Sequence, residues 1–116
     1  MSAHIVVLCT VGRVEDAEAI ARALVDERLA ACVSIVPSVV SIYRWKGVVQ
    51  RDEERLLVIK SRRERFEELR AAIVARHPYE VPEIVALPLD AGHAPYLAWI
   101  DECVGAIRQD PPGADG

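Results

Sequence analysis

The pattern of apolar and polar positions predicts strands and helices that alternate along most of the chain. Residues 5–9 (IVVLC) form a continuous apolar run of strand length, which is typical of a central strand covered on both faces. From residue 14 to about residue 27, charged residues occupy one helical face and the other face is apolar. This pattern predicts an amphipathic helix, with a weak N-cap because Gly12 and Arg13 precede it.

The middle of the chain predicts a long hairpin. Residues 32–45 are rich in β-branched side chains, and their alternation beyond Pro37 places a tyrosine and a tryptophan on one face. Pro37 itself indicates a bulge or an edge strand. Lys46 and Gly47 begin a turn, and residues 54–61 return as the partner strand.

The second half of the chain predicts two more helices and a fourth strand. The sequence Ser61-x-x-Glu64 is typical of a capping box, and the helix that it opens carries an apolar face ending at His77. Prolines bracket residues 83–87, which indicates a strand at an edge of the sheet. Residues 96–107 repeat apolar positions at helical spacing and predict a last helix.

The order β-α-β-β-α-β followed by a helix predicts an α+β, ferredoxin-like sandwich. We expect an antiparallel sheet with the first two helices on one face, in a single domain of residues 1–108. Residues 109–116 (QDPPGADG) predict a disordered tail. Only the last helix is left to cover the opposite face of the sheet, so self-association is expected.

Composition and charge exclude several classes of protein. The chain has 116 residues and a formal net charge of −4, without a dense basic block, which argues against a nucleic-acid-binding surface. The longest uncharged stretch, residues 29–43, is shorter than the roughly 18–20 apolar residues of a membrane span. No signal peptide is recognised at the start, so a cytoplasmic location and no membrane partner are expected.

The cysteines and short motifs narrow the chemistry further. Cys9, Cys32 and Cys103 are widely spaced and form no CxxC pair, which excludes zinc-finger and thioredoxin-like sites, and each alone is typical of a small buried side chain. The sequence contains no GxGxxG, Walker-type loop, GxSxG or HExxH motif. A non-enzymatic protein is therefore expected.

Two segments concentrate side chains that could carry chemistry. Residues 77–83 (HPYEVPE) combine an imidazole, a phenol and two carboxylates between two prolines, although these prolines could simply end a helix and start a strand. Residues 41–47 (SIYRWKG) place an arginine between two aromatic rings, a combination that is also typical of subunit interfaces. Lys60 lies on an apolar strand face, where it either reaches water or pairs inside a pocket that would suit an anion.

These blocks, together with LAAC at residues 29–32 and YLAW at residues 96–99, resemble the CutA divalent-cation tolerance family over about residues 5–107. The resemblance implies a cytosolic homotrimer of ferredoxin-like subunits, similar in architecture to the PII signalling proteins. In such a trimer the long hairpins interlock neighbouring subunits, and the sheets face the interior. This arrangement agrees with the expected self-association.

The resemblance also implies a metal site. Its ligands fall on Cys9 and Glu83, whereas the position of the family's histidine ligand is Arg76 here and His77 is the nearby substitute. A shift of one residue along a helix turns a side chain by about 100°, so His77 does not replace that ligand automatically. The resemblance implies copper as the ion, with zinc as the alternative. Both ions favour thiolate and imidazole ligands, so that one thiolate and one carboxylate form an incomplete set.

A second site implied by the resemblance is a pocket between subunits, next to His77 and Glu83. It is lined by Tyr43, Trp45, Lys60, Tyr79 and Glu80. Three functions are therefore open ahead of an enzyme, which comes fourth. The first is a trimeric, non-enzymatic, copper-type divalent-metal binding and tolerance protein. The alternatives are a PII-like sensor of a small anionic metabolite in the pocket, and a structural trimer whose link to metals is indirect.

Overall fold

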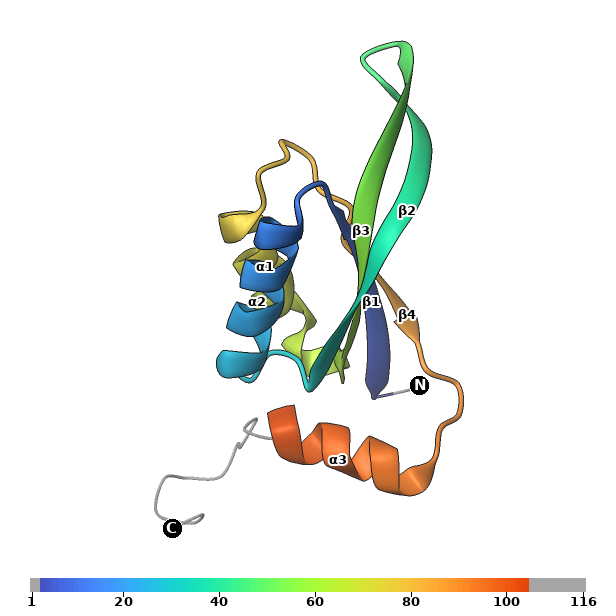
Figure 1. Ribbon diagram of the computed structural model, residues 1–116. Helices are drawn as coiled ribbons and strands as arrows, with labels where there is room; N and C mark the ends of the chain where they lie inside the picture. The colour runs from blue at the N-terminus through green and yellow to red at the C-terminus, as the bar shows by residue number, and fades with distance from the viewer. Residues whose placement is uncertain (1–2, 105–116) are drawn as a thin grey trace.

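The computed structural model describes residues 3–104 and has the α+β architecture that the sequence predicts (Figure 1). Its elements are β1 (His4–Val11), α1 (Val14–Asp26), β2 (Cys32–Trp45), β3 (Val48–Arg62), a 3₁₀ turn (Arg63–Arg65), α2 (Phe66–Arg76), β4 (Val85–Pro88) and α3 (Ala94–Val104). The strands form one sheet in the order β2-β3-β1-β4, and every neighbouring pair is antiparallel. This is the expected ferredoxin-like arrangement, with β4 at an edge.

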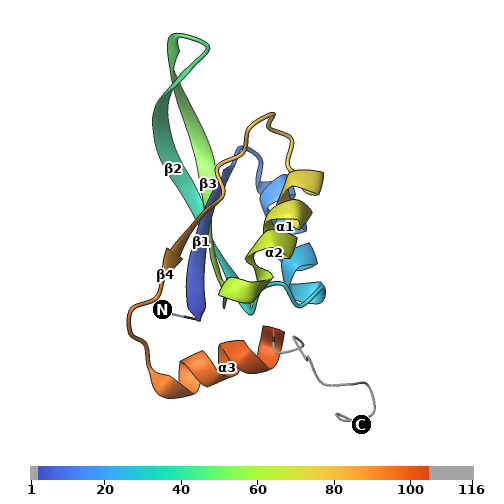
Figure 2. The same cartoon turned by 180° about the vertical axis from the view of Figure 1, so that it is seen from behind.

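The hydrophobic core lies between one face of the sheet and the helices α1 and α2 (Figures 1 and 2). Burial alternates along β1, so that every second side chain from Ile5 to Val11 is buried under the helices. Leu24 of α1 and Ile73 of α2 close this layer. The prediction that β1 is covered on both faces is wrong for the described chain, because α1 and α2 both lie on the same side of the sheet.

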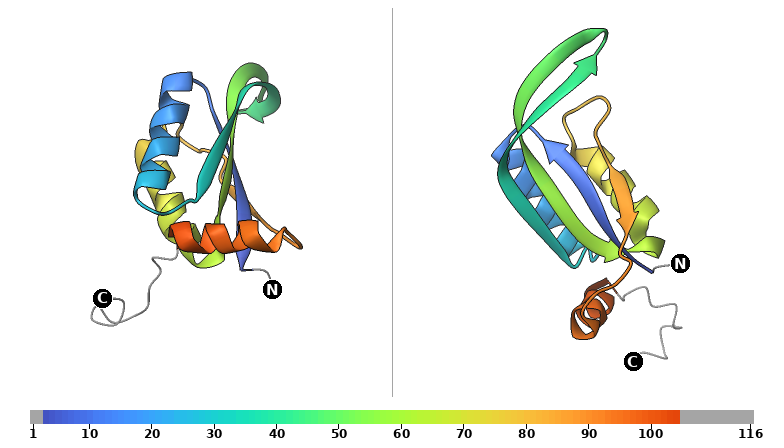
Figure 3. Two further views of the ribbon diagram at one scale, coloured as in Figure 1. Left: turned by 60° about the horizontal axis from the view of Figure 1, so that its bottom comes forward. Right: turned by 90° about the vertical axis from the view of Figure 1, so that its right-hand side faces the viewer.

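Strands β2 and β3 form a hairpin that projects beyond the rest of the sheet (Figure 3). Its turn has only two residues, Lys46 (φ 52°) and Gly47 (φ 82°), which is the geometry of a type I′ turn. The register shifts between Val36 and Val39, as the proline between them predicts. Strand β3 begins at Val48 rather than at the predicted residue 54, since a projecting strand need not alternate apolar and polar residues.

The start of α2 differs from the prediction. Ser61 does not cap a helix, because β3 runs on through Arg62 in pairing with β1. The Ser61 hydroxyl instead donates a 2.6 Å hydrogen bond to the carbonyl oxygen of Leu29, in the connection from α1 to β2. Helix α2 therefore begins at Phe66, and His77 follows its last residue in an extended conformation.

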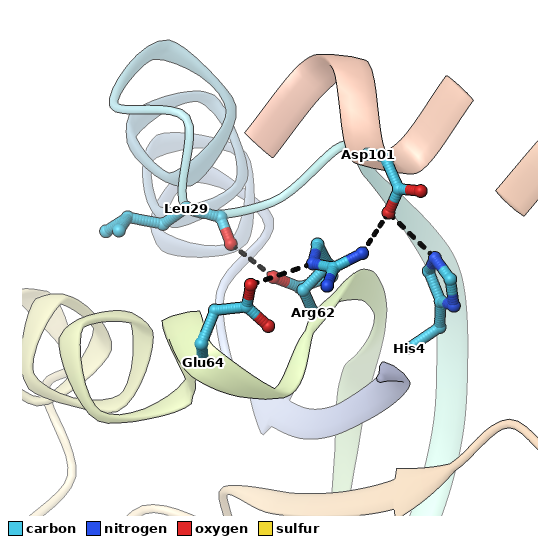
Figure 4. A network of polar contacts seen from close by, with 6 residues as sticks. His4, Leu29, Arg62, Glu64 and Asp101 are labelled. Atoms are coloured by element: carbon cyan, nitrogen blue, oxygen red, sulfur yellow. Dashed lines mark hydrogen bonds and ion pairs between the residues drawn. The ribbon is translucent and has the colours of Figure 1, made fainter. Parts of the chain in front are cut away.

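Helix α3 runs across the end of the sheet that lies away from the hairpin turn. It leaves uncovered the face of the sheet opposite α1 and α2, which we call the open face (Figures 1 and 3). Its apolar residues Ile100 and Val104 pack against Ala31. Its Asp101 accepts hydrogen bonds from Arg62 and from His4 Nε2, the latter at 2.9 Å (Figure 4). The end of the predicted helix, including Ile107, and the predicted tail of residues 109–116 lie outside the described residues.

Candidate functional site

A cavity of about 720 Å³ opens where the β2–β3 hairpin meets the connection from α2 to β4. The hairpin and the connection contribute most of its walls, and β1 contributes one residue near its end. The lining consists of Thr10, Ser41, Ile42, Tyr43, Trp45, Asp52, Glu54, Tyr79, Glu80, Val81 and Glu83. Both segments that the sequence singled out therefore meet at one site.

Strand geometry explains why the hairpin presents these residues together. Side chains alternate along a strand, so Ser41, Tyr43 and Trp45 share one face of β2. Asp52 lies directly opposite Ser41 on β3, and Glu54 follows two residues later on the same face. The two-residue turn fixes this register and brings acidic side chains next to aromatic ones.

Two phenols in the cavity donate hydrogen bonds to carboxylates. Tyr79 Oη donates to Glu54 Oε2 at 2.6 Å, and Tyr43 Oη donates to Asp52. Burial first, and then this hydrogen bond, raises the pKa of Tyr79 well above its usual value. The hydrogen bond to Asp52 raises the pKa of Tyr43. Both phenols therefore stay protonated at neutral pH and act as donors.

His77 is buried beside the cavity with both ring nitrogens in use. Its Nε2 lies 2.8 Å from the carbonyl oxygen of Thr10, and its Nδ1 accepts the backbone N–H of Tyr79 at 3.1 Å. These contacts assign the neutral tautomer with the proton on Nε2. Since a metal ligand needs a free nitrogen lone pair, His77 in this arrangement positions Tyr79 rather than binding a metal.

Cys9 is fully buried on the helix-facing side of β1. Burial, followed by the nearby carboxylates of Glu83 and Glu54, raises the pKa of its thiol to about 12. The thiolate is the form that binds soft metals, so the present surroundings of Cys9 disfavour metal binding. In residues 3–104, no group of three or more His, Cys, Asp and Glu side chains is arranged to hold a metal ion.

Lys60 lies apart from the cavity, towards the other end of β3. Its Nζ lies 3.0 Å from Ser34 Oγ, and six residues of extended strand, about 20 Å, separate it from Glu54. One chain thus brings together Tyr43, Trp45, Tyr79 and Glu80, but not Lys60. A pocket between subunits that includes Lys60 stays a prediction.

Two lining residues, Asp52 and Glu54, did not stand out in the sequence. The predicted partner strand began at residue 54 and so left out Asp52, and Glu54 is recognised only with the register of the hairpin. A signal was present in the turn. A two-residue turn at Lys46-Gly47 pairs Trp45 with Val48, and counting back along both strands places Asp52 opposite Ser41.

Comparison with known proteins identifies the family. A family model described as "CutA1 divalent ion tolerance protein" matches residues 5–103. The chain belongs to this family. Its description is that of a tolerance protein and not of an enzyme, which agrees with the expectation from the sequence.

Among its relatives, the "Divalent-cation tolerance protein CutA" of Thermus thermophilus is 54% identical over 100 residues, which cover 86% of this chain and 97% of that protein. The solved structure of the Thermus thermophilus protein matches with a TM-score of 0.86 at 53% identity, covering 88% of this chain and 99% of that one. "Protein CutA, chloroplastic" of Arabidopsis thaliana is 47% identical over 83% of this chain, which spans only 53% of that relative. No helix in the described part of this CutA1 family member is long and apolar enough to cross a membrane.

Proposed function

We propose that this protein is a non-enzymatic divalent-cation tolerance protein that binds its ions at the carboxylates of the cavity. The observation that carries the proposal is the charge of the lining, which has four carboxylates and no lysine, arginine or histidine side chain. Carboxylate oxygens are ligands for divalent cations, and closely placed negative charges attract them. The relatives named for divalent-cation tolerance support this role.

Glu83 and Glu80 are the most available ligands within the cavity. Both carboxylates are exposed to solvent, and neither has a hydrogen-bond or ion-pair partner among residues 3–104. Glu54 and Asp52, by contrast, already accept hydrogen bonds from phenols. We therefore expect Glu83 to contribute directly to cation binding, as the resemblance to the family implies.

Copper bound through Cys9 is a second candidate, because the thiol lies near Glu83 and Glu54. In the present structure the donor set does not fit copper or zinc. The Cys9 thiol is protonated, and the nitrogens of His77 are both engaged. Copper binding at this set of residues would require Cys9 to lose its proton and His77 to give up a hydrogen bond.

The alternative of an anionic metabolite is weaker for this cavity. Four carboxylates repel an anion, and Lys60, the cation that the sequence offered for it, lies elsewhere on β3. An anion sensor would therefore need a positive charge from a neighbouring subunit.

The proposal includes a homotrimer in the cytoplasm. The open face of the sheet and the exposed apolar side chains of the hairpin, such as Ile42 and Val49, would be covered by neighbouring subunits. The described cysteines are all free, which suits a reducing compartment.

The test is a titration of the purified protein with Cu²⁺, Zn²⁺ and Mn²⁺ against a competing chelator, after its mass has been measured by light scattering. Glu83→Gln should weaken binding about tenfold or more, because a charged ligand is lost. Glu53→Gln is the matched control, since Glu53 is exposed on β3 and does not line the cavity.

The Cys9→Ser protein separates the two candidates. If the cavity carboxylates hold the ion, Cys9→Ser leaves the affinity for all three ions unchanged. Loss of copper binding alone in Cys9→Ser would favour the thiol site instead. No competition with the chelator by any of the ions would refute cation binding by the isolated protein.

A further inference from the structure

The aromatic walls of the cavity are not explained by metal binding. The rings of Tyr43, Trp45 and Tyr79 line it, and these residues remain 37% to 40% exposed. The hydrophobic core formed within residues 3–104 includes none of the three. A divalent metal ion bound in a protein is coordinated through oxygen, nitrogen or sulfur atoms. The chain therefore places three accessible aromatic rings beside the carboxylates, where coordination of a metal ion does not require them.

Rings and carboxylates together match one ligand chemistry. The faces of aromatic rings attract ammonium groups, with Trp the strongest, and they also pack against methylene groups. Carboxylates pair with the same ammonium groups. The volume of about 720 Å³ lies within the usual range of small-molecule sites, about 300–1,000 Å³.

One ammonium group is already attracted to this wall. Lys46 Nζ lies 5.6 Å from the centroid of the Trp45 ring, which is within the range of a cation–π contact. Lys46 itself does not line the cavity. Lys46 makes this contact from the next position in the chain, and it shows an ammonium group at cation–π distance from a ring of the cavity wall.

We propose that the cavity binds a small organic cation of the aliphatic diamine class. Its methylene chain lies along the rings of Trp45 and Tyr79, and its ammonium groups pair with carboxylates, foremost Glu80 in the connection to β4. This inference goes beyond metal tolerance, because its ligand is organic and its recognition depends on the rings.

The test uses isothermal titration calorimetry of the full-length protein in about 150 mM salt, which screens nonspecific attraction to a negatively charged surface. EDTA is present so that divalent ions do not contribute. Three probes share a four-carbon chain and differ in charge: 1,4-diaminobutane, 1,4-butanediol and butanedioate. Saturable binding of the diamine alone is expected.

Two pairs of variants locate the site. Trp45→Leu should weaken diamine binding about threefold to thirtyfold, whereas Trp99→Leu, which removes a comparably exposed ring on α3, should leave it unchanged. Glu80→Gln should weaken binding about tenfold, and Glu53→Gln should not. Trp45→Tyr retains an aromatic face and should preserve most of the affinity, which separates loss of the ring from loss of the fold.

Several results would overturn the inference. Diamine heats no larger than those of butanediol would do so, as would equal losses in Trp45→Leu and Trp99→Leu. Binding of butanedioate in place of the diamine would show an anion site. The inference and the metal proposal fail separately, because diamine binding is measured in EDTA through Trp45 and Glu80, and metal binding without amine through Glu83.

Discussion

At the scale of single residues, the contact between Tyr79 and Glu54 holds the cavity together. Glu54 is only 4% exposed, and a buried carboxylate is costly unless it accepts a hydrogen bond. Tyr79 supplies that bond from another part of the chain, at 2.6 Å. Gly12 makes room for it, because a Cβ atom there would come within 3.0 Å of the phenol oxygen. His77 accepts the backbone N–H of Tyr79 and so fixes its position.

Removing this phenol should destabilise the protein. In Tyr79→Phe the ring stays, but Glu54 loses its hydrogen-bond donor inside the protein. We expect the free energy of unfolding to fall by about 1–3 kcal/mol, measured by urea denaturation.

Tyr43→Phe is the matched control, because it removes the other phenol that donates to a carboxylate. Its partner Asp52 is exposed and can bond water instead, so the expected loss is below about 1 kcal/mol. Equal losses in the two variants would contradict the importance of burial at Glu54.

At the scale of elements, the sequence alone predicted a helix or strand correctly where a pattern of apolar residues corresponds to a buried face of that element. The core side of α1 and the apolar run of β1 predicted their elements correctly, and Pro37 predicted the bulge in β2. Prediction failed at the start of β3 and at Ser61. The projecting half of β3 has no buried face to impose alternation, and the pairing of β3 with β1 through Arg62 outweighs the local capping signal.

The candidate site was predicted only in part, because the pairing of strands and the packing of helices decide which residues meet there. Tyr79 and Glu80 stand out between prolines, and Tyr43 and Trp45 stand out as aromatic residues. Recognising Glu54 requires the register of the hairpin, which is a property of two strands. The buried state of Cys9 likewise depends on α1 and α2 covering that side of β1.

The contacts of Asp101 in helix α3 should make the stability of the fold depend on pH. Partial burial alone would raise the pKa of Asp101, but the hydrogen bonds from Arg62 and His4 outweigh it and hold that pKa below its usual value of 3.8. The ionised carboxylate therefore stabilises the fold at pH values above 3.8, and this contribution is lost as the pH falls through the lowered pKa.

Asp101→Asn should consequently reduce the free energy of unfolding at pH 7 by about 1 kcal/mol or less, because the contact is half exposed and screened by solvent. The difference from the unmodified protein should shrink in acid. Urea titrations at several pH values measure both effects. Glu102→Gln changes the neighbouring exposed acid and should have no such pH dependence; a loss for Asp101→Asn that persists at the lowest pH would argue against the charge as its cause.

At the scale of the whole molecule, the shape of the subunit bears on its assembly. The chain extends over 54 × 28 × 23 Å, since the β2–β3 hairpin projects from the sheet (Figure 3). Apolar residues on the hairpin are exposed, Val49 to 59%, although nothing in the subunit's own core requires them to be apolar. The two edge strands, β2 and β4, add unpaired backbone groups at either side of the sheet. Such a subunit is expected to bury its hairpin against copies of itself.

The proposed trimer therefore predicts that a charge on the hairpin breaks assembly without unfolding the subunit. Light scattering of the unmodified protein should give three times the 12.8 kDa chain mass, and Val49→Glu should lower it towards one chain, because an unpaired charge would be buried in the interface. Val74→Glu introduces the same charge at a 47% exposed valine of α2, outside the hairpin, and should leave the mass unchanged. Circular dichroism checks that both variants remain folded, since substitutions at exposed positions usually change stability by about 0.5 kcal/mol or less. An unchanged mass for Val49→Glu would place the hairpin outside the interface, and a monomeric unmodified protein would refute the trimer.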